Sequence, residues 1–149
     1  MLREVGSLCL APIALAGYLY ASEVTTNVSK RTEHTTGQGA VATVLTCDRG
    51  LGLGVKGATN GLYAVEAHYG LKGELGSFSA SLLPKAGLSY TDHTVKELPQ
   101  TLQFSVGAQL LLGFEHYRAG VELWHLSNAG MTQPNIGLNM VVIQAGWEF

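Results

Sequence analysis

The chain has little charge and few cysteines, and its apolar N-terminal run is too short to cross a bilayer as a helix. Only 13% of the 149 residues are charged, and the formal net charge is −2. A nucleic-acid partner would require a basic patch, so this composition argues against one. Disorder is also disfavoured, because 46% of the residues are hydrophobic while charge is low. The length fits one domain better than two.

The apolar run at the N-terminus covers residues 8–20 and has the length of the hydrophobic region of a signal peptide. The small residues Ala21 and Ser22 follow it and suit a signal peptidase. We therefore expect residues 1–22 to be a signal peptide and residues 23–149 to be the mature domain. A buried N-terminal helix is the alternative interpretation of this run.

Beyond residue 37 the sequence alternates between apolar and small or polar residues, which is typical of β-strands. In one such stretch Tyr63 and Val65 fall on one face, while Ala64 and Glu66 fall on the other. The polar faces are rich in Gly and Ser, whereas a soluble sandwich would expose many Lys and Glu residues. Small residues suit the interior of a narrow barrel, where a neighbour can neutralise an isolated charge. The apolar faces would then contact lipid.

Counting back from the C-terminus gives eight strands, the number found in the smallest membrane barrels. The expected strands cover residues 138–149, 116–127, 101–113, 78–90, 62–72, 51–57, 38–47 and 24–32. Aromatic residues near strand ends resemble the girdle that such barrels place at the membrane interfaces: Tyr63, Phe78, Tyr90, Trp147 and Phe149. The predicted fold is all-β, an eight-stranded antiparallel transmembrane β-barrel of the outer-membrane type. A soluble barrel that binds an apolar ligand is the weaker alternative.

The connections between these strands agree with a barrel that crosses the outer membrane. If the C-terminus faces the periplasm, the connections at 48–50, 73–77 and 113–116 are periplasmic, and all three are short, as expected. The longer connections at 91–100 and 128–138 then lie outside the cell.

Few residues suit disulfide or metal chemistry. Removal of the leader would leave Cys47 as the single cysteine, so no intrachain disulfide is expected. His68 shares the expected interior face with Glu66 and Lys72, and we interpret the three as a buried polar cluster, because no second ligand pair has suitable spacing. No metal and no other cofactor is expected.

The residues best suited to catalysis lie at the end of the penultimate expected strand. His125 and Ser127 are two positions apart, so both point to the apolar face that would contact lipid. A neutral imidazole within hydrogen-bond reach is the usual base for a serine nucleophile. Asn128 and Gly130 follow and offer oxyanion donors, and Asn139 has the parity to lie across from His125. The alternative is a purely structural role at the rim of a membrane strand.

Residues 125–139 read HLSNAG, two further residues and then QPNIGLN, and this segment resembles the C-terminal motif of the lipid A 3-O-deacylases, the PagL family. The resemblance implies an esterase in the outer membrane of a Gram-negative bacterium that removes the 3-linked acyl chain of lipid A as a 3-hydroxy fatty acid. It implies Ser127 as nucleophile, His125 as base, and Asn128 and Gly130 near the oxyanion. The implied partners are lipopolysaccharide and the surrounding outer-membrane lipids, and a homodimer is left open.

The sequence departs from the family pattern at Asn139, where the family carries a Glu. A carboxylate orients the imidazole and stabilises its cation, whereas an amide supplies no charge. Glu122 lies on the opposite strand face and is not a ready substitute. Three outcomes are therefore open: the amide suffices, activity is weak, or catalysis is lost. The alternative function is that of a non-catalytic barrel for adhesion or membrane architecture, in which Ser127 and His125 would be replaceable.

Overall fold

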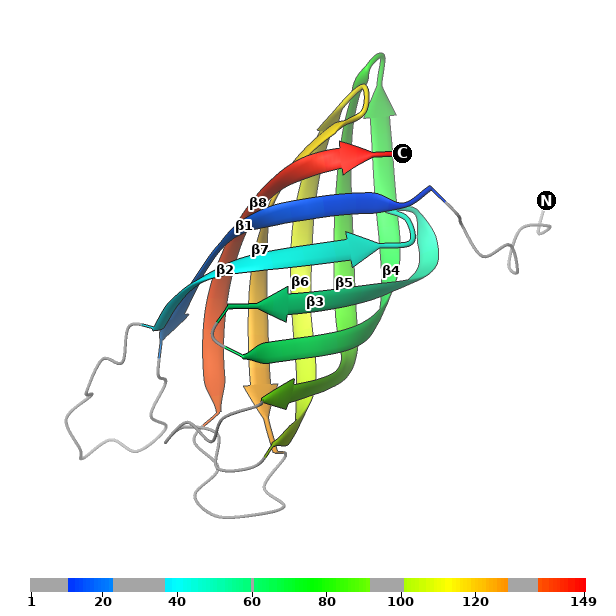
Figure 1. The fold of residues 1–149 in the computed structure, drawn as a ribbon. Helices are drawn as coiled ribbons and strands as arrows, with labels where there is room; N and C mark the ends of the chain where they lie inside the picture. The colour runs from blue at the N-terminus through cyan, green and yellow to red at the C-terminus, as the bar shows by residue number, and fades with distance from the viewer. Residues whose placement is uncertain (1–10, 23–36, 60, 92–100, 129–136) are drawn as a thin grey trace, which may run out of the picture.

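The structure is a computed structural model that describes residues 11–22, 37–59, 61–91, 101–128 and 137–149. These residues form eight antiparallel strands that close into one barrel (Figure 1). The strands are β1 (Ile13–Ser22), β2 (Gly37–Leu45), β3 (Gly50–Ala58), β4 (Leu62–Leu75), β5 (Phe78–Thr91), β6 (Leu102–Phe114), β7 (Tyr117–Ser127) and β8 (Leu138–Glu148). Each strand pairs with its neighbours in sequence, and β1 pairs with β8 to close the barrel. The predicted fold class is confirmed.

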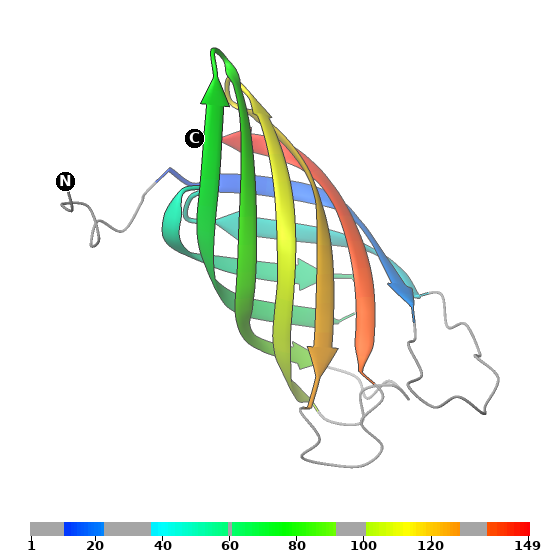
Figure 2. The ribbon, with the colours of Figure 1, turned by 180° about the vertical axis from the view of Figure 1, so that it is seen from behind.

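The two ends of the barrel differ. The β2–β3, β4–β5 and β6–β7 turns lie at the same end as the C-terminus, and the β4–β5 hairpin projects furthest there (Figures 1 and 2). The last residues of β7 and the first residues of β8 lie at the opposite end. Within the ranges that the structure describes, no helix is long and apolar enough to cross a membrane.

Side chains alternate between the interior and the outer surface along the strands β3 to β8, except at the projecting end of β4, where the last three residues are all exposed. The outer surface is apolar, and all five aromatic residues predicted for the interfacial girdle are exposed on it: Tyr63, Phe78, Tyr90, Trp147 and Phe149. Two apolar clusters fill parts of the interior, one around Trp124 and Met140 and one around Leu45 and Leu111. A barrel whose outer surface is apolar is suited to a lipid environment.

Between these apolar clusters the interior holds a network of charged side chains. The Lys56 ammonium lies 2.8 Å from Glu66 Oε2 and also contacts the Glu122 carboxylate. Lys85 lies 3.4 Å from the same Glu122 carboxylate and contacts Gln109. All four charged groups are buried, so each must have a partner of opposite sign. The expected neutralisation of interior charges by neighbours is confirmed.

A second polar cluster lies nearer to the short turns. The His68 ring donates from Nε2 to the Cys47 carbonyl oxygen at 2.8 Å, and the Lys72 ammonium donates to Asp48 at 3.2 Å. His68 and Asp48 are both buried. His68 is thus a buried, hydrogen-bonded residue as predicted, but the expected cluster of His68, Glu66 and Lys72 is wrong for Glu66, which belongs to the first network.

The first strand of the barrel differs from the prediction. A strand was expected at residues 24–32, which lie outside the described residues, and the structure instead closes the barrel with β1. Strand β1 falls within the leader expected over residues 1–22, so a chain cleaved after Ser22 would lack the strand between β2 and β8. Processing of this segment stays a prediction.

The composition of β1 explains why the sequence predicts a leader in this segment. Ile13 and Leu15 point into the barrel and are buried in an apolar cluster, while Ala16 and Tyr18 are exposed on the outer surface. Both faces of this part of the strand are therefore apolar. An apolar run without polar alternation has the same composition as the hydrophobic region of a signal peptide.

Candidate active site

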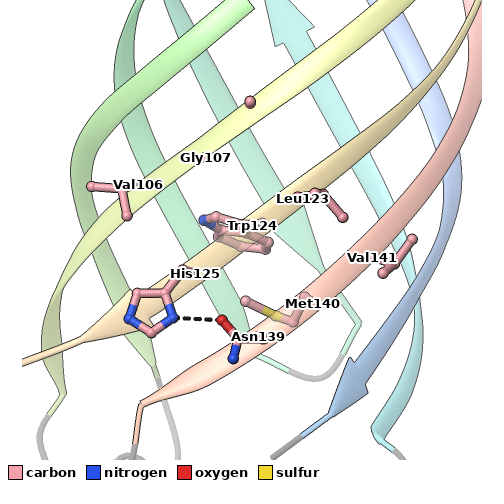
Figure 3. A pocket seen from close by; sticks show the side chains of 9 residues that line it. Val106, Gly107, Leu123, Trp124, His125, Asn139, Met140 and Val141 are labelled. Carbon is pink, nitrogen blue, oxygen red and sulfur yellow. Dashed lines mark hydrogen bonds between the residues drawn. The ribbon is translucent and has the colours of Figure 1, made fainter. Parts of the chain in front are cut away.

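The pairing of β7 with β8 places His125 directly across from Asn139. The His125 Nδ1 and Asn139 Oδ1 atoms lie 2.7 Å apart, and Figure 3 shows this hydrogen bond on the outer side of the two strands. Because the amide oxygen accepts, Nδ1 carries the ring proton. The other ring nitrogen, Nε2, then has a free lone pair and can act as a base.

Ser127 is the last residue of β7 and lies on the same outward face as His125. It pairs with Phe104 of β6, and both Ser127 and His125 are half-buried. Asn128, the next residue, is buried with 2% of its surface exposed. Gly130, the other predicted oxyanion donor, lies outside the described residues. The structure thus brings His125 and Asn139 into contact and places Ser127 on their face of the sheet.

An apolar groove begins at this hydrogen-bonded pair and crosses β6, β7 and β8. Its volume is about 450 Å³. The groove is lined by Val106, Gly107, Ala108, Leu123, Trp124, His125, Asn139, Met140 and Val141, most of which Figure 3 shows. His125 and Asn139 are the polar side chains of this lining. A concave apolar surface with a few polar groups at one end suits a ligand with an acyl chain.

Trp124 fixes the strand behind the site. Its side chain points into the barrel, is 1% exposed and donates from Nε1 to the Ser105 hydroxyl at 2.7 Å. The Ser105 hydroxyl in turn donates to Glu66, and the Lys56 ammonium lies 4.1 Å from the centre of the Trp124 ring. Trp124, the neighbour of His125 in β7, is therefore in contact with the interior charge network. Trp124 therefore packs inside the barrel, directly behind the outward-facing site.

Glu122 takes part in the interior network and is fully buried, so it does not approach the outward-facing imidazole. As predicted, Glu122 therefore does not replace Asn139 as the partner of His125.

Gly137 is a residue of the site that the sequence analysis did not single out. It precedes β8, has a positive φ of 65° and lies against the His125 ring. The sequence signal that could have identified Gly137 is its position two residues before Asn139, the expected partner of His125. Its contact with the ring, however, depends on a backbone angle that the sequence does not state.

An all-antiparallel barrel of eight strands with an apolar outer surface and a charged interior defines the class of small outer-membrane β-barrels. The profile of the family described as lipid A 3-O-deacylase (PagL) matches residues 23–148 of the chain. The chain belongs to this family, and it is accordingly an outer-membrane protein. The predicted family and location are confirmed.

Solved structures support the same fold. The crystal structure of the outer membrane enzyme PagL is similar with a TM-score of 0.51 and 20% sequence identity, over 92% of this chain and 97% of that chain. The attachment invasion locus protein Ail of Yersinia pestis is similar with a TM-score of 0.52 and 10% identity, over 93% and 97% of the two chains. Identities this low show the shared fold alone. A comparison with curated proteins found no match.

Proposed function

We propose that this protein is a serine esterase that removes the 3-O-linked acyl chain of lipid A in the outer leaflet. The observation that carries the proposal is the 2.7 Å hydrogen bond from His125 to Asn139, on the lipid-facing side of the barrel and on the same face as Ser127. Membership of the lipid A deacylase family supplies the substrate class.

The reaction begins with Ser127. Its hydroxyl oxygen attacks the carbonyl carbon of the acyl ester while His125 Nε2 takes the hydroxyl proton. The amide oxygen of Asn139 holds the imidazole in the tautomer that this transfer requires. Negative charge then develops on the former carbonyl oxygen, and Asn128 and Gly130 are the proposed donors to it.

Collapse of the tetrahedral intermediate breaks the bond to the sugar oxygen, which leaves with the proton from His125. The acyl chain remains on Ser127 as an ester. Water, deprotonated by His125, hydrolyses this acyl-enzyme and releases a 3-hydroxy fatty acid. The apolar groove that His125 lines supports the proposal, because it can hold an acyl chain beside the base. The proposed sequence of steps uses neither a metal nor a cofactor.

Mass spectrometry of lipid A tests the proposal. Cells that express the protein should lose the mass of one 3-hydroxyacyl chain from lipid A, and cells that express Ser127→Ala should not. Heat-modifiable gel migration of both proteins is the control for a folded barrel. An unchanged lipid A mass with a folded wild-type protein in the outer membrane would contradict the proposal and favour the non-catalytic barrel.

A further inference from the structure

Gly137 combines two properties that together disfavour a side chain. Its φ of 65° lies in the left-handed region, which other residues adopt only at a cost. A Cβ atom built on Gly137 would lie 3.0 Å from Cε1 and 3.6 Å from Nε2 of the His125 ring, and it would also lie 3.3 Å from the Leu126 carbonyl oxygen. The first of these distances is shorter than an ordinary contact between carbon atoms. The second atom is the nitrogen that acts as the base in the proposed reaction.

Asn139 of β8 and Gly137, which precedes β8, therefore border the His125 ring on two sides. Asn139 binds Nδ1, and the bare Cα of Gly137 lies beside the edge that carries Cε1 and Nε2. Gly137 itself is buried. A ring bonded to Asn139 on one side and bordered by Gly137 on the other has little room to turn about its bond to Cβ. A side chain at position 137 would displace the ring from the position in which Asn139 holds it.

We propose that Gly137 is a positioning residue for the His125 base, because the absence of a side chain lets the imidazole lie against β8 with Nε2 uncovered. This inference rests on the proposed function, in which Nε2 takes the proton of Ser127. Gly137 contacts no substrate in this role and acts only through the placement of the ring.

Two substitutions distinguish the steric effect of a side chain on the ring from the effect of strain in the backbone angle. Gly137→Ala adds a Cβ and strains the positive φ. Gly137→Asn adds the same Cβ, but Asn tolerates this φ far better than Ala does. If space for the ring decides, both variants should lower kcat for lipid A deacylation by about 10-fold, since displacement of a catalytic group by a fraction of an ångström is costly. KM should change little.

A matched control is available at the other end of the barrel. Gly76 has a φ of 61°, and a Cβ placed there meets nothing within 4 Å. Gly76→Asn therefore makes the same chemical change at nearly the same backbone angle without touching the site. It should keep wild-type kcat and KM. Heat-modifiable migration of all four proteins checks that each barrel is folded.

Nitrogen NMR of the His125 ring in detergent micelles gives a readout that does not depend on turnover. The Nδ1 proton that binds Asn139 should shift in Gly137→Asn and stay unchanged in Gly76→Asn. Wild-type activity in Gly137→Asn, or an unchanged ring spectrum, would overturn the proposal, because the backbone angle alone would then explain the glycine. If the wild-type protein removes no acyl chain, the proposed function fails, while the ring spectra still decide the role of Gly137.

Discussion

The interior of the barrel and the outward surface around His125 both hold polar side chains away from bulk water, but they stabilise them differently. Inside, Lys56 and Lys85 lie against Glu66 and Glu122, so four full charges neutralise one another. Outside, one hydrogen bond joins the His125 imidazole to the side-chain amide of Asn139.

This difference separates a structural arrangement from a reactive one. The buried ions are fixed by mutual attraction, and removal of any one of them leaves an uncompensated charge. The imidazole is oriented at one nitrogen and keeps a free lone pair at the other, as a general base requires. Substitutions in the interior should therefore lower the free energy of unfolding, whereas substitutions at the outward site should lower the rate of deacylation.

The largest expected effect follows from removal of the outward base. His125→Ala should lower the rate of lipid A deacylation by about 10⁴-fold, because Ser127 loses the acceptor of its proton. The urea concentration at the midpoint of unfolding should stay unchanged, since the interior ions are untouched. Purified protein and lipid A in mixed micelles allow both measurements. A large drop in this midpoint would show that the two regions are not separate.

Removal of a charge from the interior network should lower stability and leave the rate of deacylation unchanged. Glu122→Ala leaves Lys85 without its carboxylate partner and should lower the free energy of unfolding by about 3–5 kcal/mol. The folded fraction should keep its specific activity. The control is the double variant Glu122→Leu with Lys85→Met, which removes both charges and retains the Lys56–Glu66 pair. It should lose clearly less stability than Glu122→Ala, and an equal loss would argue against the unpaired charge as the cause.

A smaller effect is expected when only the orientation of the base is lost. Asn139→Leu keeps a side chain of similar size but cannot accept the proton of His125 Nδ1. We expect kcat to fall by about 100-fold, which is the lower end of the usual contribution of a positioned acid or base. Steady-state deacylation kinetics measure this, with Ile143→Leu as a control, because Ile143 lies on the same outward face of β8 but does not line the groove. Full activity in Asn139→Leu would remove Asn139 from the site.

The smallest effect should come from adding charge to the outward site. Asn139→Asp keeps the length of the side chain and gives the imidazolium a negative partner in the transition state. We expect a gain in kcat of up to about 10-fold, measured as before, and Asn139→Glu tests the residue that the family motif carries at this position. A lower rate in both variants would show that the neutral amide is the better partner at a lipid-facing position.

Period-two alternation was sufficient to predict seven of the eight strands. It placed His125, Ser127 and Asn139 on one outward surface, and the observed β7–β8 register puts His125 across from Asn139. Alternation failed for β1, because Ile13 and Leu15 face an apolar part of the interior and the polar half of the pattern is missing.

Other features depend on distances that the sequence does not contain. The contact of Lys56 with Glu122 joins β3 to β7, which are not paired in the sheet, so it follows from the diameter of the barrel and from how far each side chain reaches. The contact of Gly137 with the His125 ring depends on one backbone angle. Patterns in sequence predict which face a residue occupies, but not which residue it meets across the interior.

The placement of the His125–Asn139 pair on the flank of the barrel has a kinetic consequence. A substrate that reaches the flank arrives by diffusion within the leaflet, so the relevant concentration is its mole fraction among the surrounding lipids. The rate should then fall when inert lipid or detergent dilutes the surface, even at constant bulk substrate. Membrane composition thus becomes a variable of the reaction in its own right.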